Sequence, residues 1–366
     1  MPSILNKYAQ LLVNYCVSLK KGERVLIQST TLAEPLVREV YREVLKAGGL
    51  PHIKMAFRDQ GTIRLNESSD EQLSYVDPLQ AQAMEEFDAY IAIRAPFYSR
   101  ATPSTNPDAA KIVRAAMQPY SQRYSERTAT LELKRTLCEY PTTAHAQNAG
   151  LSLEEYADFI YNACFLYEDN PQACWEEVSS QQQHLVDYLN GCTDIHYLGE
   201  NIDIRFSTKG RTWINSDGQT NMPSGEVYTA PVDDSVNGKI HFSYPSIFRG
   251  EEVEGITLWV KDGWVERWEA EKGQELLDRI FDIDEGARRF GEAAIGTNYR
   301  IHTPVKNILF DEKIGGSVHM AVGQAYIQNG GINKSSIHWD MIADMQNGGQ
   351  IFADGKLIYE SGRFLI

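Results

Sequence analysis

Two short stretches near the end of the chain carry imidazole and carboxylate side chains at the spacing of a β-strand. In the stretch 337–341, Ile337, Trp339 and Met341 alternate with His338 and Asp340. Successive side chains of a strand point to opposite faces, so the apolar residues would enter a core and the other two would share the opposite face. On a helix, residues two apart diverge and could not bind one ligand. The stretch therefore predicts a strand that presents a histidine and an aspartate together.

The stretch 317–323 repeats this pattern around His319. Val318, Met320 and Val322 would form the apolar face, while the neighbours of His319 on its own face are serine, alanine and glycine. These small side chains leave room for a metal ion, a water molecule or a substrate. A single histidine on a strand is more often a hydrogen-bonded structural residue. Two such strands about 20 residues apart, one of them also carrying a carboxylate, favour a metal site instead.

Three glutamates lie next to turns or glycines that would direct their side chains. Glu226 follows a Pro-Ser-Gly turn, Glu292 follows a glycine at the expected end of a helix, and Glu312 precedes two glycines. Any one of the 50 acidic residues would by itself be interpreted as a solvated surface charge. Together with the two histidines and the aspartate they form an oxygen-rich set, which suits zinc, manganese or cobalt better than calcium or an iron–sulfur cluster.

The elements that must position these residues fall into two parts. Up to residue 190, strand and helix signals alternate and then give way to helices, which predicts an α/β N-terminal domain with a parallel sheet. The expected strands are 24–28, 51–55 and 89–93, and the expected helices are 33–47, 109–117, 152–164 and 175–189. His145 and His184 stand alone among these helical residues and are expected at the surface.

After residue 190 the pattern changes to short strands separated by Gly, Asn and Asp turns. We therefore expect residues 191–366 to form an α+β, strand-rich catalytic domain. Residues 271–289 are expected to form one or two helices that end just before Glu292, where a glycine would let that side chain turn away from the helix axis.

Composition excludes several classes of partner. A net charge of −15 argues against nucleic acid and against an anionic membrane surface, because both need a clustered basic surface. No apolar run approaches the ~18 residues of a membrane span, and the first 21 residues predict an amphipathic helix that lacks the apolar run of a signal peptide. Five widely spaced cysteines without a Cys-x-x-Cys motif indicate free thiols and a cytoplasmic location.

At its candidate site residues the sequence resembles the thermophilic-type metallo-aminopeptidases, the aminopeptidase T and aminopeptidase S type of two-metal exopeptidase. The resemblance covers essentially the whole chain and is sharpest from residue 221 onward. It is carried by Asn-Met-Pro-Ser-Gly-Glu ending at Glu226, Phe-Gly-Glu ending at Glu292, Leu-Phe-Asp-Glu ending at Glu312, His-Met-Ala-Val-Gly from His319, and His-Trp-Asp from His338.

This resemblance implies two divalent metal ions held by the three glutamates, the two histidines and Asp340. One of Glu226 and Glu292 would bridge the ions or act as general base, and Tyr326, which matches a tyrosine of the family, would steady the tetrahedral intermediate. It also implies a homodimer and peptide substrates with a free N-terminus. The connection between His319 and His338 is shorter than in the best-known members. This difference would reshape the rim of the substrate site and leave the metal positions intact.

Two other classes of function stay open at this point. One is a relative that binds metal or peptide without cleaving it, and the full ligand set argues against it. The other is a two-metal hydrolase that acts on a phosphoester or a cyclic amide. The acidic charge and the lack of an arginine cluster for anions argue against that class. Metal-dependent aminopeptidase is the first interpretation.

Overall fold

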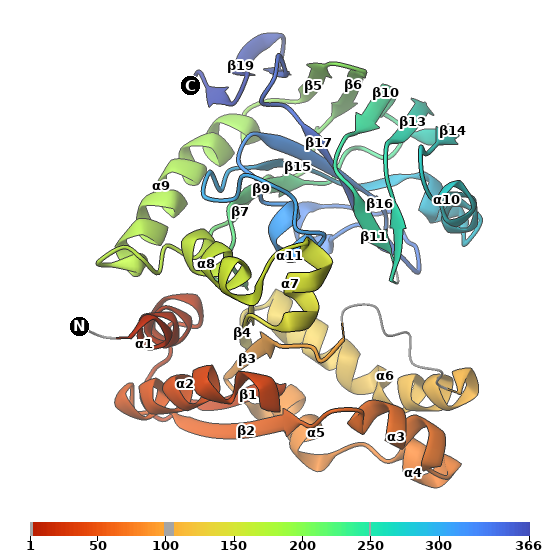
Figure 1. The fold of residues 1–366 in the computed structure, drawn as a ribbon. Coiled ribbons are helices and arrows are strands. Elements are labelled where there is room, and N and C mark those ends of the chain that lie inside the picture. The colour runs from red at the N-terminus through yellow and green to blue at the C-terminus, as the bar shows by residue number, and fades with distance from the viewer. Residues whose placement is uncertain (1–2, 99–105, 249) are drawn as a thin grey trace. The chain divides into compact units, whose positions relative to one another are not determined.

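The computed structural model describes residues 3–98, 106–248 and 250–366, which form two compact units (Figure 1). Unit 1 contains Met1–Gln172 and Gly218–Pro223, and unit 2 contains Ala173–Asp217 and Ser224–Ile366. The predicted fold class is confirmed, with a parallel sheet and helices in unit 1 and antiparallel sheets in unit 2. That the chain divides into two domains after residue 190 stays a prediction. The helix Pro171–Asn190, which precedes this boundary, belongs almost entirely to unit 2.

Unit 1 is built on a five-stranded sheet with the order β2-β1-β3-β4-β8, in which each neighbouring pair is parallel. Its strands are β1 (Arg24–Thr30), β2 (Leu50–Ala56), β3 (Ala89–Arg94), β4 (Lys134–Glu139) and β8 (Asn221–Met222). Val25, Leu26 and Ile27 are completely buried on β1. A continuous apolar run of this kind is typical of a parallel strand covered on both faces, which is what the sequence predicted.

Helices pack around this sheet (Figure 1). In α2, Leu36, Val37, Val40 and Val44 form a buried stripe at helical spacing. The helix α8 begins with a capping box between Ser152 and Glu155, as the sequence indicated. The helices are α1 (Ile4–Gln10, continued by a π-helical turn, Leu11–Cys16), α2 (Glu34–Lys46), α3 (Gln60–Glu67), α4 (Asp70–Ser74), α5 (Pro78–Glu86), α6 (Pro107–Ala129), α7 (Thr143–Ala149) and α8 (Leu153–Ala163).

Unit 2 contains two large antiparallel sheets, a small strand pair and a few helices. The larger sheet has the order β14-β13-β10-β6-β5-β18-β19-β20, with β5 (Asp194–Gly199), β6 (Ile202–Ser207), β10 (Asn237–Phe242), β13 (Ile256–Lys261), β14 (Trp264–Glu269), β18 (Gln350–Ala353), β19 (Lys356–Glu360) and β20 (Arg363–Phe364). The second has the order β17-β16-β15-β9-β7, with β7 (Ile214–Ser216), β9 (Glu226–Thr229), β15 (Phe290–Gly296), β16 (Ser317–Gly323) and β17 (His338–Asp344). The remaining elements of unit 2 are α9 (Pro171–Asn190), β11 (Ser246–Phe248), β12 (Glu251–Val253), α10 (Gln274–Phe281), α11 (Ile308–Asp311) and 3-10 turns at Glu285–Arg288 and Ile327–Asn329. Unit 1 has a 3-10 turn at Thr31–Ala33.

The two large sheets of unit 2 share one hydrophobic core. Tyr197 and Ile204 enter it from the eight-stranded sheet, and Val318, Met320 and Met341 enter it from the five-stranded sheet. All five side chains are fully buried. Because one face of the five-stranded sheet is committed to this core, the alternate residues of its strands are free to carry chemistry on the other face.

The strand β15 corrects one expectation. Glu292 was expected at the end of a helix, but the helical stretch ends with the turn Glu285–Arg288 and Glu292 lies inside a strand. A β-bulge at Gly291 shifts the register, so Phe290 enters the core while Glu292 faces the other way. A Cβ at Gly291 would come within 2.5 Å of the Gly323 carbonyl oxygen, which is why this bulge requires glycine.

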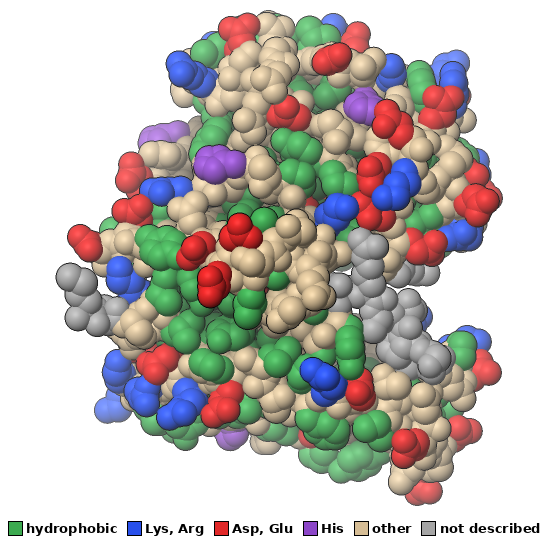
Figure 2. Space-filling view, in the orientation of Figure 1, with side chains coloured by type: hydrophobic (Ala, Val, Ile, Leu, Met, Phe, Trp, Pro, Cys, Tyr) green, Lys and Arg blue, Asp and Glu red, His purple; other side chains and the backbone are tan. Residues whose placement is uncertain are grey.

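The surface mixes charges of both signs. On the face shown in Figure 2, blue and red side chains are interspersed among the described residues, and no broad basic area stands out. Among the described residues, none of the helices has the length and apolar character needed to cross a membrane.

Candidate metal centre

Four neighbouring strands bring the predicted residues to one face of the five-stranded sheet. Glu226 begins β9, Glu292 lies on β15, His319 on β16, and His338 and Asp340 on β17. The strands predicted around the histidines are confirmed, with Trp339 and Met341 in the core on the opposite face. The small residues expected beside them are also in place, since Ala321 pairs with Asp340 and Gly323 with His338.

The first group of candidate ligands is formed by Glu226, Glu292 and His319, all buried. The Nε2 atom of His319 lies 3.3 Å from Oε2 of Glu226 and 3.5 Å from Oε1 of Glu292. Neither ring nitrogen of His319 has a hydrogen-bond partner, and the same is true of Oε2 of Glu226. Buried polar atoms are rarely left unpaired in native proteins, so these orphaned atoms fit a bound cation.

The second group is formed by Glu292, His338 and Asp340. Nε2 of His338 lies 3.2 Å from Oε2 of Glu292 and 3.5 Å from Oδ1 of Asp340. The other ring nitrogen, Nδ1, lies 2.7 Å from the backbone oxygen of Gln324 and must donate to it, because a carbonyl only accepts. The neutral ring therefore keeps its lone pair on Nε2, the arrangement by which metal-binding histidines are usually oriented.

The electrostatics of this face favour positive charge. Burial by itself lowers the pKa of His319, but its contacts with Glu292 and Glu226 outweigh burial and raise the pKa to about 9. Burial likewise raises the pKa of Glu292, and its contacts with His319 and His338 outweigh that effect and lower the pKa. A cluster that holds protons this strongly also stabilises metal cations.

Glu312 belongs to neither group, so its predicted role as a ligand stays a prediction. Its carboxylate is paired with the ammonium of Lys313, whose side chain is completely buried and whose Nζ atom lies 3.6 Å from Oε1 of Glu226. Burial raises the pKa of Glu312 to about 8, with Glu226 adding to the effect and Lys313 opposing it. Sequence reasoning missed Lys313 because a lysine is ordinarily a surface residue; the available signal was its place next to a candidate ligand.

Tyr326 lies beside the second group. Its ring centroid is 4.9 Å from that of His338, and 40% of the residue's surface is exposed. Loss of solvent around the phenol raises its pKa far above the ordinary value, and the carboxylates of Glu292 and Asp340 add to the effect. The phenol therefore stays protonated at neutral pH and can donate a hydrogen bond.

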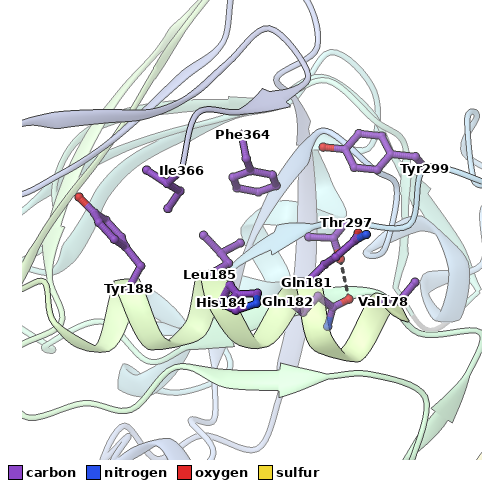
Figure 3. Close-up of a pocket in the computed structure, with 10 residues that line it drawn as sticks. All are labelled: Val178, Gln181, Gln182, His184, Leu185, Tyr188, Thr297, Tyr299, Phe364 and Ile366. Atoms are coloured by element: carbon purple, nitrogen blue, oxygen red, sulfur yellow. Dashed lines mark hydrogen bonds between the residues drawn. The ribbon is translucent and has the colours of Figure 1, made fainter. Parts of the chain in front are cut away.

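A cavity of about 590 Å³ lies at a different place in unit 2, between α9 and the last residues of the chain (Figure 3). Its wall contains none of the predicted site residues. Gln182 is its link to the centre, because its amide donates to the backbone oxygen of Glu226 at 3.1 Å while its carbonyl accepts from Thr297 at 2.8 Å. This side chain supports the start of β9.

Unit 1 holds a second cluster of histidine and carboxylate. The carboxylate of Glu139, completely buried at the end of β4, accepts from Tyr156 and contacts Nδ1 of His145, both at 2.6 Å. His145 was expected at the surface but is half-buried because of this contact, whereas His184 is exposed as expected. The local pattern of the helix around His145 gave no sign of a partner on a strand.

Comparison with known proteins agrees with the fold and with the use of a metal. The thermophilic metalloprotease (M29) family matches residues 2–364. Aminopeptidase 2 of Geobacillus stearothermophilus is 30% identical over 98% of this chain and 97% of its own length, and aminopeptidase T of Thermus thermophilus is 28% identical over 98% and 95%. The solved structure of wild-type AmpT from Thermus thermophilus superposes with a TM-score of 0.84 at 26% identity, covering 99% of both chains.

The chain therefore belongs to the thermophilic metalloprotease (M29) family, whose members are metal-dependent hydrolases of peptide bonds. Within that class it is an aminopeptidase, since its matches to proteins of that name extend over nearly the whole of each chain. The resemblance stated from the sequence is confirmed, and so is the interpretation as an enzyme.

Proposed function

We propose that the aminopeptidase works with two divalent ions, one held by Glu226, Glu292 and His319 and the other by Glu292, His338 and Asp340. The observation that carries this proposal is the position of Glu292, which belongs to both groups and offers a different carboxylate oxygen to each histidine. A carboxylate placed in this way is suited to bridge two ions. Glu312 remains a prediction as a further ligand.

Two divalent ions in such a site lower the pKa of a shared water towards neutrality and polarise the scissile carbonyl. The chain's own residues supply the rest. Glu226 and Glu292 both belong to the proposed ligand groups, so the proton of the attacking water would pass to a carboxylate oxygen of one of these two residues. Tyr326 donates its phenolic hydrogen to the carbonyl oxygen as negative charge develops there, because its raised pKa keeps the hydrogen in place.

The substrate class follows from the charge of the site. A cluster of carboxylates can receive the α-ammonium of a peptide, and a peptide that lacks this charge leaves an acceptor unpaired. Such a loss costs ~1–3 kcal/mol, and it also removes the orientation that holds the carbonyl for attack. We therefore propose sequential release of single residues from peptides with free N-termini.

One experiment tests the ions and the substrate together. Protein purified without chelator should contain two equivalents of zinc, cobalt or manganese by elemental analysis. It should release N-terminal residues from short peptides and leave the same peptides intact once they are N-acetylated. Equal cleavage of free and acetylated peptides, internal cuts, or turnover of phosphoesters in place of aminoacyl amides would contradict the proposal.

Location and assembly are parts of the same proposal. All five cysteines are free thiols, which supports the cytoplasm as the compartment. We also propose a homodimer, which the resemblance to the family implied. Light scattering at micromolar concentration should give twice the 41.4 kDa of the chain, and a single-chain mass would contradict it.

A further inference from the structure

Tyr326 lies outside the strands that carry the proposed metal ligands. It comes after the end of β16 and just before the turn Ile327–Asn329, and its side chain is partly exposed. Its main chain is held, because its backbone oxygen accepts from the N–H of Gly331 at 3.1 Å. Its hydroxyl group has no hydrogen bond to another described residue, so two neighbouring rings are left to direct the side chain.

The first of these rings belongs to Tyr228. This residue lies on β9 on the same face as Glu226, because Val227 between them enters the core. The ring centroids of Tyr228 and Tyr326 are 5.9 Å apart, and the ring planes make an angle of 67°. This distance and this edge-to-face angle are the geometry that aromatic pairs prefer. The contact is therefore a specific one between two side chains of the same face.

The second ring is that of His338, which contacts Tyr326 from the other side of the sheet. The centroids of these two rings are 4.9 Å apart. The strand β17, which carries His338, is separated from β9 by β16 and β15. On β15, the small residue Ala294 pairs with Tyr228. Because alanine fills little of this face, the ring of Tyr228 has room to extend over β15 towards Tyr326.

We propose that Tyr228 is a positioning residue that holds the phenol of Tyr326 in the direction from which it donates to the substrate. This inference rests on the proposed function, which assigns that hydrogen bond to Tyr326. A side chain free to rotate must lose conformational entropy before it can donate. A donor already fixed in place needs no rearrangement as charge develops on the carbonyl oxygen. Since Tyr228 acts through its ring, another aromatic residue at this position can take over the role and an aliphatic residue cannot.

The test begins with two variants, Tyr228→Leu, which removes the ring, and Tyr228→Phe, which keeps it. The rate constant is measured in a single turnover, so that product release does not mask the chemical step. Tyr228→Leu should lower this rate constant roughly 3- to 10-fold, the equivalent of one aromatic pair. Its KM and its metal content by elemental analysis should change much less. Tyr228→Phe should keep most of the wild-type rate.

A double-variant cycle shows whether the effect passes through Tyr326. In a Tyr326→Phe background, the loss caused by Tyr228→Leu should disappear, because no hydroxyl group is left to direct. A ring that only supports β9 would lower the rate in both backgrounds. An equal loss in both, a Tyr228→Phe variant as slow as Tyr228→Leu, or a Tyr228→Leu variant as fast as wild type would overturn the inference. If Tyr228→Leu does not fold, Tyr228→Val replaces it, since a β-branched side chain suits a strand.

Binding of a tetrahedral analogue gives a readout that does not depend on turnover. An α-aminoalkylphosphonate presents an oxygen where the tetrahedral intermediate would have one, and such analogues report on contacts made in the transition state. Calorimetry should show that Tyr228→Leu weakens its binding by the same factor as the rate. An affinity equal to that of the wild type would also overturn the inference.

Two comparisons separate this result from other causes. Phe364→Leu is the matched control, because it removes a ring that meets Tyr359 in unit 2 at 5.3 Å and 70°, and it should keep the wild-type rate. A wild-type protein without divalent ions, or a Tyr326→Phe variant with full activity, would overturn the proposed function itself. Two bound ions, a slow Tyr326→Phe variant and an unaffected Tyr228→Leu variant would overturn only the role of Tyr228.

Discussion

Two buried clusters in this molecule are made of the same kinds of side chain and differ in how many donors they contain. In unit 1, the carboxylate of Glu139 accepts from the phenol of Tyr156 and lies against an imidazole of His145, so the donors match the acceptor. In unit 2, three carboxylates gather around two histidines, and the nitrogens of His319 have no hydrogen-bond partner. The acceptor atom of the first cluster is supplied with donors, whereas the second has unpaired buried atoms that fit a bound cation.

This difference teaches that residue type alone does not mark a metal site. Glu139 with His145 would attract attention in any search for histidine–carboxylate pairs, yet Oε1 of Glu139 already has two hydrogen-bonding partners, Tyr156 and His145. What distinguishes the face of β9, β15, β16 and β17 is an excess of acceptors among side chains that are mostly buried. The predictions below test that distinction.

The largest effect is expected from the proposed metal ligands of unit 2. His338→Ala or Asp340→Asn should lower kcat on the order of 10³-fold or more, because residues that act as one catalytic unit lose most of its effect when one is removed. Thermal stability should fall only modestly, since Trp339 and Met341 still pack in the core. The measurements are steady-state kinetics and a thermal melt. His145→Ala, the matched change in unit 1, should keep its full metal content; near-normal turnover in both unit 2 variants would make their strand structural.

A comparable effect on activity is expected from removal of the ions. Chelation should abolish activity, and zinc, cobalt or manganese should restore it. An ion present at 1,000 times its dissociation constant stabilises the folded protein by ~4 kcal/mol, so the melting temperature should drop on chelation and return on reloading. Full activity after elemental analysis shows complete removal of metal would contradict the metal centre.

A third prediction concerns the cluster of unit 1. Glu139→Gln should lower the free energy of unfolding by ~1–3 kcal/mol, because a neutral amide oxygen is a weaker acceptor for the buried phenol of Tyr156 than the carboxylate is. Its metal content should equal that of the wild type. Denaturant unfolding gives the first quantity and elemental analysis the second, with the exposed Glu154→Gln as the control. Loss of metal in Glu139→Gln would erase the distinction between the clusters.

The smallest effect is expected at Asp284 of unit 2, whose carboxylate accepts several hydrogen bonds. It caps the turn Glu285–Arg288 and accepts from the hydroxyl of Ser335 and from the backbone of Ser336, just before the strand that carries His338. Asp284→Ala should cost ~1 kcal/mol of folding free energy at pH 7, the usual value of such a cap. This loss should be measured by urea unfolding.

The same residue gives a pH dependence. Burial by itself raises the pKa of Asp284, but the hydrogen bonds from Ser336 and Ser335 outweigh it and lower the pKa. A lowered pKa in the folded state means that the contribution is fully present above the ordinary aspartate pKa of about 4 and is lost as pH falls through the lowered value. The difference between wild type and Asp284→Ala should therefore shrink below pH 4. A difference that grows on acidification would contradict this assignment.

The strands of the site could be predicted because their signal is local. Alternation in 317–323 and 337–341 fixes which face is buried, and that alone brings His338 next to Asp340. The element around Glu292 could not be predicted in the same way. Its register depends on a bulge at Gly291 that exists only because the Gly323 backbone passes close by. No pattern within the strand predicts that the Gly323 backbone lies so close.

Partners that lie far apart in the sequence were also beyond a local pattern. Tyr156 and His145 meet Glu139 only after β4 and two helices have packed. The burial of Lys313 could not be predicted for a different reason. Its charge predicts a solvent-exposed side chain, and only the surrounding carboxylates make its burial possible. The parallel sheet of unit 1, by contrast, followed from continuous apolar runs and was predicted correctly.

The strand β8 has a consequence for how the protein is made. The chain passes between the units after residues 172, 217 and 223, so the edge strand of the first sheet is encoded inside the segment of the second unit. On a ribosome, where N-terminal parts emerge first, the parallel sheet cannot be finished until Asn221–Met222 has left the exit tunnel. By then the helix α9 and the first antiparallel strands are already outside. Unit 1 is therefore completed only after part of unit 2 has been made, and no single cut in the gene yields either unit whole.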